Sequence, residues 1–251
     1  MKIRIKNQVI GDIDLIIFDR DGTLIDLYAY WSWMIAKRAE LVCEKLHLNS
    51  SQRKELINHM GVDEKKHILK PEGPVGIKPR ETVMQSGIDY AESLGHHDCR
   101  PVFLEAFKQT DELSVAHLSE IIKPIKGLLG LFDTIIVHKG KIAIATTDKT
   151  ERAQLSINHL ELTKKVACVI GADRVKQSKP APDMVFNILK NLNIEAQRTV
   201  MVGDAITDIQ MGKNAGLKAS IGVCTGITPL KELAAATPFI INDISEIKIE
   251  S

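Results

Sequence analysis

Two aspartates separated by one residue are the first candidates for chemistry in this sequence. Asp19 and Asp21 follow the apolar run at residues 15–18, and Gly22 comes directly after them. In an extended chain, side chains two positions apart point the same way, so the two carboxylates can converge on one small volume. Both stay ionised there only if a cation lies between them, and Mg²⁺ prefers oxygen ligands. A surface turn rich in Asp and Gly is the ordinary alternative.

A second and a third cluster offer groups that bind anions. Thr146 and Thr147 follow the apolar residues 142–145 and precede a helix start, where hydroxyls and backbone N–H groups can hold an anion. Lys179 precedes a proline, which favours an extended backbone and a fixed ammonium group. Each signal has an alternative, because Thr147 or Asp148 can cap the following helix and most such lysines are solvated.

The fourth cluster is again acidic. Asp204 follows the apolar residues 199–202, and Asp208 lies four positions further on, near the start of the next predicted helix. If the turn is helix-like, both acids share a face, although the helix dipole alone explains an acid at Asp208. Together the four clusters supply four acids, one lysine and one or two hydroxyls. That composition fits metal-assisted phosphoryl transfer.

These side chains meet only if the strands before them belong to one sheet. Apolar runs of strand length occur at residues 15–18, 142–145, 168–170, 199–202, 219–223 and 239–241. After residue 124 such runs alternate with helical stretches, which predicts an α/β fold with a parallel sheet covered by helices on both faces. Ligands of such sheets bind beyond the carboxyl ends of the strands, where all four clusters should lie.

Residues 26–123 lack this alternation and are predicted to be mostly helical, without a convincing strand pattern. Helices are expected at about residues 30–46, 51–60, 79–94 and 101–122, the last with a break near residues 110–111. The Gly- and Pro-rich residues 71–79 must form a loop. We therefore predict a core made of residues 1–25 and 126–251, with residues 26–125 inserted as a helical domain.

Composition excludes several classes of function. The 251 residues are 44% hydrophobic and 26% charged, as in ordinary globular proteins. A net charge of +1 and an aromatic content of 4% argue against nucleic-acid or anionic-membrane partners. No apolar run is long enough to span a bilayer, and the N-terminus lacks the apolar segment of a secretory signal. Four cysteines without CxxC spacing are typical of the cytoplasm, where we expect this protein.

The sequences DRDGTLID, IAIATTD, SKPAPD and MVGDAITD, in this order, resemble the four motifs of the haloacid dehalogenase superfamily. The run from residue 123 through the second motif is similar to the helix and strand that lead into that motif in the family. The resemblance covers residues 15–26 and 124–223 and points to the phosphoglycolate phosphatase-like branch. It implies a Rossmann-like core with a helical cap inserted after the first motif.

The resemblance also implies a reaction. The chain would be a Mg²⁺-dependent phosphatase that hydrolyses a small soluble phosphomonoester of the phosphoglycolate, sugar phosphate or nucleotide class. Asp19 would be the nucleophile that forms an aspartyl-phosphate, and Asp21 would act first as general acid and then as general base. Lys179 would neutralise charge on Asp19 and on the phosphoryl oxygens. An acid at position 21 favours phosphate substrates, because dehalogenase members of the family lack it.

The remaining roles concern the metal and the phosphoryl group. The metal ligands would be Asp19, Asp204 and the backbone carbonyl of Asp21, with Asp208 supporting the metal site or the lysine. The substrate-binding residues would be Thr146, Thr147 and Gly22. Arg20 departs from the family pattern, in which an apolar residue is more common there. We expect its side chain to point away from both acids, against the last strands or a neighbouring subunit, without a catalytic role.

The predicted helical domain holds further candidates. Lys70, Lys78 and Arg80 either contact an anionic leaving group or are solvated loop residues. Four of the eleven aromatic residues lie within residues 28–33. Of these, Tyr30 and Trp33 are expected in the core of the domain, whereas Tyr28 or Trp31 is a candidate for the substrate pocket or a dimer contact.

Two other functions stay open. A phosphomutase of the β-phosphoglucomutase type would pass the phosphoryl group from the same aspartate to a sugar instead of water, and the core motifs do not separate the two reactions. A non-enzymatic binder would use the cap as a partner surface, but it has no reason to keep like charges crowded in one place. The sequence defines neither the substrate nor the oligomeric state.

Overall fold

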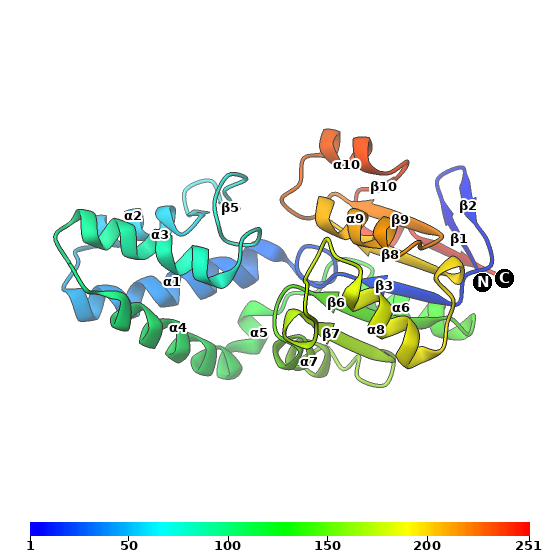
Figure 1. The fold of residues 1–251 in the computed structure, drawn as a ribbon, viewed down its shortest axis with the longest axis horizontal. Helices are drawn as coiled ribbons and strands as arrows, with labels where there is room; N and C mark the ends of the chain where they lie inside the picture. The colour runs from blue at the N-terminus through cyan, green and yellow to red at the C-terminus, as the bar shows by residue number, and fades with distance from the viewer. The chain divides into compact units, whose positions relative to one another are not determined.

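A computed structural model describes all 251 residues of the chain, which divides into two compact units (Figure 1). The core unit consists of residues 1–26 and 124–251, and the helical unit consists of residues 27–123. No helix in either unit has both the length and the apolar character that crossing a bilayer requires.

A six-stranded parallel sheet forms the centre of the core unit, in the order β10-β9-β8-β3-β6-β7. The strands are β3 (Leu15–Phe18), β6 (Lys141–Thr146), β7 (Cys168–Gly171), β8 (Thr199–Gly203), β9 (Ala219–Val223) and β10 (Phe239–Ile241). Strand β3 pairs with β6 on one side and with β8 on the other. The first, second and fourth polar clusters therefore follow three neighbouring strands, as the sequence predicts.

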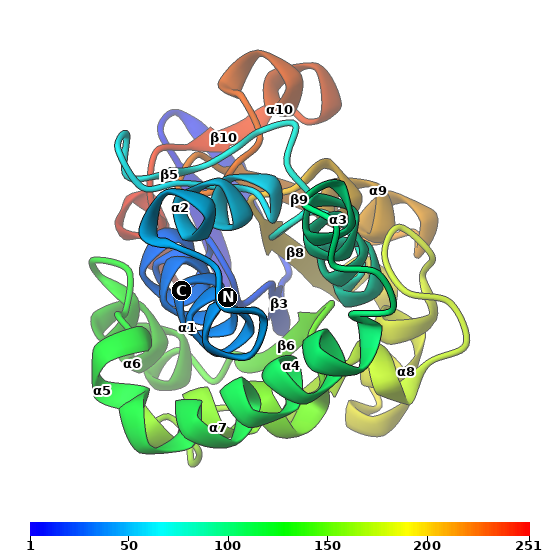
Figure 2. The same ribbon diagram turned by 90° about the vertical axis from the view of Figure 1, so that its left-hand side faces the viewer.

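Helices cover both faces of this sheet (Figure 2). One face carries α6 (Leu128–Val137) and α7 (Thr150–His159), and the other carries α8 (Asp183–Leu192) and α9 (Ile206–Asn214). Helix α10 (Leu230–Ala236) packs against α9 and β10. In β3, Ile16 and Phe18 join one buried cluster and Leu15 and Ile17 join the other. A strand buried on both faces needs an unbroken apolar run, which explains the pattern seen in the sequence.

A second sheet in the core unit joins the two ends of the chain. It consists of β1 (Lys2–Ile5), β2 (Gln8–Ile10) and β11 (Lys248–Glu250), all antiparallel. Ile3, Ile5 and Ile10 are buried on the face of the main sheet that carries α6. These strands were not predicted, because strands of three or four residues are too short to show a clear alternation.

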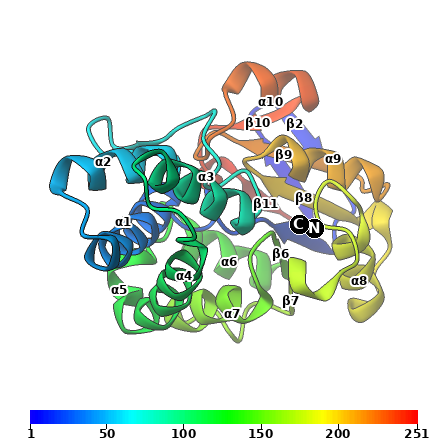
Figure 3. The ribbon, with the colours of Figure 1, turned by 60° about the vertical axis from the view of Figure 1, so that its left-hand side comes forward.

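The helical unit contains four main helices (Figure 3). These are α1 (Leu27–Leu46), α2 (Ser50–His59), α3 (Arg80–Ser93) and α4 (Arg100–Ser114), followed by η1 (Val115–His117) and α5 (Leu118–Ile121). Helices α1 and α3 each pack against both α2 and α4, and the buried side chains between them include Met34, Met84 and Phe103. Residues 71–79 form the expected loop.

Two predictions for the helical unit were wrong. The break in the last predicted helix lies at η1 and not near residues 110–111, because the buried Thr110 hydroxyl donates to the Ala106 carbonyl and stays within the helix. The unit also contains a small antiparallel pair, β4 (Val62–Asp63) and β5 (Ile68–Leu69), where no strand was expected. Two residues per strand leave no periodic pattern to detect.

Candidate active site

Three buried carboxylates meet at the carboxyl ends of β3 and β8. Asp19 directly follows β3, and its backbone N–H donates to the Val202 carbonyl of β8 at 2.8 Å. Asp204 directly follows β8, and Asp208 lies in the first turn of α9. One carboxylate oxygen of each residue lies within 4.8 Å of the other two. We call Asp19, Asp204 and Asp208 the acid cluster.

Asp208 is fixed by the start of its own helix. Its Oδ2 accepts a hydrogen bond from the Ala205 N–H at 3.0 Å, which satisfies one of the free donors at the N-terminus of α9. A Cβ atom on Gly203 would lie 2.4 Å from the Asp208 side chain, so the close approach requires glycine. Asp208 therefore lies in the first turn of its helix, where the helix dipole favours an acid, and it also belongs to the acid cluster.

Lys179 connects two members of the acid cluster. Its Nζ lies 2.5 Å from Asp19 Oδ1 and 2.7 Å from Asp208 Oδ1, and its side chain is only 2% exposed. Burial alone would lower the pKa of Lys179, but the two carboxylates hold this pKa above its ordinary value. The lysine is thus a fixed cation, and the alternative of a solvated surface residue is excluded.

The charges of this site do not balance. Burial, opposed by Lys179 and reinforced by repulsion from Asp208, raises the pKa of Asp19 to about 6. Burial and repulsion from Asp19 and Asp208 raise the pKa of Asp204 well above its usual range. Three carboxylates face one ammonium group, so a second cation would relieve the repulsion. Converging carboxylate oxygens are the ligands that Mg²⁺ prefers, and the residues present therefore fit this metal.

Backbone from two turns surrounds Asp204. Gly22 has a φ of +84°, and a Cβ atom there would lie 2.8 Å from the Asp204 carboxylate. The Thr23 hydroxyl donates to Asp204 Oδ1 at 3.3 Å, and the Thr225 hydroxyl donates to the Gly22 carbonyl. A Cβ atom on Gly226 would lie 1.6 Å from Asp204 Oδ2. Thr225 and Gly226 were not predicted as site residues, because their only signal in the sequence is a Gly-containing turn after the strand at residues 219–223.

The two threonines of the second cluster differ in position. Thr146 is the buried last residue of β6, and its hydroxyl accepts a hydrogen bond from the Asp148 N–H at 3.1 Å. The register pairs Ile144 with Phe18, which places Thr146 level with the residues after Asp19. Thr147 is exposed, and neither it nor Asp148 is the N-cap of α7, which is Lys149. The capping alternative for this cluster is therefore wrong.

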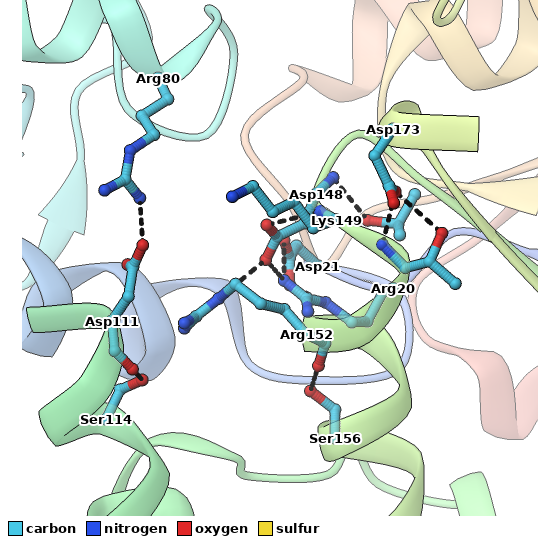
Figure 4. A network of polar contacts seen from close by, with 12 residues as sticks. Arg20, Asp21, Arg80, Asp111, Ser114, Asp148, Lys149, Arg152, Ser156 and Asp173 are labelled. Carbon is cyan, nitrogen blue, oxygen red and sulfur yellow. Dashed lines mark hydrogen bonds and ion pairs between the residues drawn. The ribbon is translucent and has the colours of Figure 1, made fainter. Parts of the chain in front are cut away.

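The expectation for Arg20 was also wrong. The residue is fully buried and points toward Asp21, not away from it (Figure 4). Its Nε and Nη2 donate to the two carboxylate oxygens of Asp21 at 2.8 Å each, and Nη2 also donates to Asp148 Oδ2 at 2.7 Å. A guanidinium group is almost never buried without an acidic partner, and the partner at position 148 is invisible from the local sequence.

A second charged group thus lies beside the acid cluster. We call Arg20, Asp21, Asp148 and Arg152 the arginine network. Burial raises the pKa of Asp21, although the charge of Arg20 opposes this effect. Burial would also raise the pKa of Asp148, but Arg20 and Arg152 together hold this pKa below its usual range. The Nε of Arg152 lies 3.4 Å from Asp148 Oδ2.

The candidates in the helical unit are placed as follows. Arg80 donates to Asp111 Oδ2 at 2.7 Å, within the helical unit (Figure 4). Tyr30 is buried as expected, whereas Trp33 is half-buried, packs on His117 and lines a hollow together with Tyr28. The expectation that Trp33 is a core residue was therefore wrong.

Comparison with known proteins assigns the family. Residues 16–222 match the model of the family described as "Haloacid dehalogenase-like hydrolase". The chain therefore belongs to this family.

Two similar proteins carry phosphatase names. A phosphoglycolate phosphatase from Pseudomonas fluorescens is 27% identical over 91% of this chain and 76% of its own length. A protein named "Probable phosphatase IndB" from Dickeya dadantii is 33% identical over 49% of this chain. That second match spans only 56% of the relative's length.

Solved structures share the fold at low identity. A predicted phosphoglycolate phosphatase from Haemophilus somnus superposes with a TM-score of 0.71 at 16% identity, covering 94% of this chain and 96% of that one. A β-phosphoglucomutase from Clostridium difficile gives a TM-score of 0.60 at 20% identity and covers 94% of each chain. These likenesses confirm the parallel α/β fold predicted from the sequence.

Proposed function

We propose that this protein is a Mg²⁺-dependent phosphatase that hydrolyses a small phosphomonoester through an aspartyl-phosphate on Asp19. The observation that carries the proposal is the ion pair of Lys179 with Asp19 and Asp208, set beside Asp204 in a buried site. The phosphatase names of the relatives support the same reaction class. The substrate is of the phosphoglycolate, sugar phosphate or nucleotide class.

The first half of the reaction moves the phosphoryl group to the protein. A carboxylate oxygen of Asp19 attacks phosphorus, a new P–O bond forms, and the bond from phosphorus to the leaving oxygen breaks. Asp21 gives its proton to the leaving oxygen, which departs as an alcohol. Lys179 keeps Asp19 ionised and offsets negative charge on the phosphoryl oxygens, to which Thr146, Thr147 and backbone near Gly22 donate hydrogen bonds.

The second half restores the protein. Water attacks the phosphorus of the aspartyl-phosphate, and Asp21, now ionised, accepts the proton of that water. The P–O bond to Asp19 breaks and inorganic phosphate leaves. Asp19, Asp204 and the backbone carbonyl of Asp21 would hold Mg²⁺, with Asp208 in support, and the ion would supply positive charge to the transferring oxygens.

In this proposal the helical unit is the cap of the family, and the chain passes between the core and cap domains near residues 26 and 125. Lys70 and Lys78 remain candidates for contact with an anionic leaving group. A small phosphorylated metabolite is then the partner of the site, and neither nucleic acid nor a membrane is needed.

The test is a screen of phosphate release from a panel of small phosphoesters, with Mg²⁺ or with EDTA. We expect release from at least one ester only when Mg²⁺ is present. The Asp19→Asn variant should release none, whereas the matched Asp14→Asn variant should act like the wild type. Asp14 lies at the other end of β3, where it pairs with Arg198 at the surface. Release that persists in Asp19→Asn would contradict the proposal.

A phosphomutase is the second candidate, and the structural likeness to a β-phosphoglucomutase favours keeping it. Both reactions begin with the same aspartyl-phosphate, so Asp19 does not distinguish them. Incubation with a hexose 1-phosphate distinguishes them, because a phosphatase yields free phosphate and a mutase yields the isomeric hexose phosphate.

A further inference from the structure

We propose that Arg20, anchored by Asp148, is a positioning residue that sets the orientation of the Asp21 carboxyl group for proton transfer to the leaving oxygen. This inference rests on the proposed function, because it gives Arg20 a part in the same reaction. It concerns geometry alone, and it starts from the three hydrogen bonds that Arg20 donates within the arginine network.

The contact between Arg20 and Asp21 fixes the plane of the carboxyl group. Nε and Nη2 bind one oxygen each, both at 2.8 Å, which is the two-pronged geometry of a guanidinium on a carboxylate. The terminal torsion of an aspartate is otherwise broad, so a single hydrogen bond would leave the group free to turn. Each oxygen keeps a further lone pair for exchange of a proton with substrate or water.

The anchor comes from the neighbouring strand. Asp148 accepts from Arg20 Nη2 at 2.7 Å and also from the backbone N–H of Lys149 at 2.8 Å. Arg152 Nε approaches the same carboxylate at 3.4 Å. Strands β3 and β6 are adjacent in the sheet, and the guanidinium group of Arg20 is held between the turns that follow them.

The exposure of the two side chains distinguishes the role of Asp21 from that of Arg20. The Arg20 side chain is 1% exposed, whereas the Asp21 side chain is 12% exposed. A bound ester can therefore reach Asp21 while Arg20 lies behind it. Arg20 acts through Asp21 and does not itself touch the substrate, which makes it a positioning residue.

The test uses substrates that differ in their need for an acid. An alkyl phosphate from the panel needs a proton on its leaving oxygen, whereas p-nitrophenyl phosphate has a leaving group that departs without one. Because kcat/KM reports only on steps up to phosphoryl transfer, we compare this constant between the two esters. In Arg20→Met we expect a loss of about tenfold to a hundredfold with the alkyl ester and less than about threefold with the aryl ester. The loss should appear in kcat, with little change in KM.

A double-variant cycle shows whether Arg20 acts through Asp21. Adding Arg20→Met to Asp21→Asn should cause no further loss with the alkyl ester, because the group that is being positioned has already been removed. Arg20→Lys, which keeps the charge but loses the two-pronged contact, should fall between wild type and Arg20→Met. The matched control is Arg198→Met, which removes another two-pronged arginine–aspartate pair, with Asp14, and should leave the ratio of the two constants unchanged.

Several results would overturn the inference. Equal losses with both esters, or losses that multiply in the double variant, would show that Arg20 has a structural role only. If Arg20→Met does not fold, Arg20→Lys and Asp148→Asn take its place. Both should lower kcat/KM for the alkyl ester relative to that for the aryl ester, and an unchanged ratio in both variants would refute the positioning role of Arg20. Wild-type protein that hydrolyses neither ester would refute the proposed function as well. Activity that Asp19→Asn abolishes, with an unchanged ratio in Arg20→Met, would refute the inference alone.

Discussion

Two charged groups lie at the carboxyl ends of neighbouring strands, and they differ in the balance of their charges. The acid cluster sets three carboxylates against the single ammonium of Lys179. The arginine network sets two carboxylates against two guanidinium groups. Both groups are largely buried, so burial alone does not distinguish them.

The difference in balance separates a site that needs a further cation from one that does not. In the acid cluster, burial and mutual repulsion raise the pKa of Asp204, and no second arginine or lysine offsets this effect. In the arginine network, Arg20 and Arg152 overcome the burial of Asp148 and lower its pKa. We infer that the first group is built to receive a divalent cation and that the second is built to hold its own members in place.

The largest expected effect comes from Asp19, the proposed nucleophile. In the proposed reaction Asp19→Asn removes the oxygen that attacks phosphorus, so it should lower kcat by about 10⁴-fold or more without loss of the fold. Phosphate release and circular dichroism measured on the same preparation check this prediction. A variant that stays folded and keeps a tenth of wild-type activity would show that the acid cluster is not the catalytic centre.

The next effect concerns stability in the arginine network. Asp148→Asn removes one of the two carboxylates that offset the charges of Arg20 and Arg152, so the free energy of unfolding should fall by about 2–3 kcal/mol. Denaturant titration with and without Mg²⁺ measures this change. The increase in stability caused by Mg²⁺ should be the same as in wild type, because Asp148 is not among the proposed metal ligands. If Mg²⁺ no longer stabilises Asp148→Asn, the arginine network takes part in metal binding and is not separate from the acid cluster.

The third effect is the pH dependence of stabilisation by Mg²⁺. Asp19 has a pKa of about 6 in the folded protein against an ordinary value of 3.8, so the folded state keeps a proton between these values that the unfolded chain has lost. The metal-free protein therefore loses stability as pH rises through this window. Below about pH 6, the folded-state pKa of Asp19, Mg²⁺ must compete with a proton for this carboxylate.

Thermal unfolding provides the measurement. With Mg²⁺ at about a hundred times its dissociation constant, Tm should rise by about 5–10 °C at pH 7.5. At pH 5 the same concentration should raise Tm much less. An equal rise at both pH values would mean that protons and metal do not share the acid cluster.

The smallest effect runs opposite to that of most substitutions in a buried site. Asp204→Asn removes one of three repelling carboxylates and keeps the shape of the side chain. The metal-free variant should therefore melt about 2–4 °C higher than wild type, which corresponds to about 1 kcal/mol. The Mg²⁺ response should be lost in the same variant. Metal-free Asp204→Asn that melts below wild type would show that the carboxylates do not repel one another.

The positions that the sequence predicts well are those fixed by regular structure. Asp19, Thr146 and Asp204 follow buried strands whose apolar runs are plain, and parallel strands bring such positions to one edge. The sequence also predicts the order of strands and helices after residue 124. These features depend on local periodicity, which a single sequence displays.

The positions that the sequence predicts poorly depend on contacts between distant segments. Arg20 meets Asp148, which lies 128 positions further along the chain, and nothing near either residue indicates that pairing. Gly226 is needed because the turn after β9 approaches Asp204, a contact that no spacing reveals. Strands β1, β2 and β11 pair the two ends of the chain and are too short to show a period. Each of these features depends on a contact between segments that are far apart in the sequence.

The most direct test of the acid cluster is chemical trapping of the phosphorylated nucleophile. The Asp21→Asn variant, which lacks the base for hydrolysis, is mixed with p-nitrophenyl phosphate and Mg²⁺ and then treated with borohydride, which reduces an acyl phosphate to an alcohol. Mass spectrometry of the peptides should find Asp19 converted to homoserine only when both substrate and Mg²⁺ were present. Phosphate release from the wild type, together with unmodified Asp19 in the trapped variant, would contradict the assignment of Asp19 as the nucleophile.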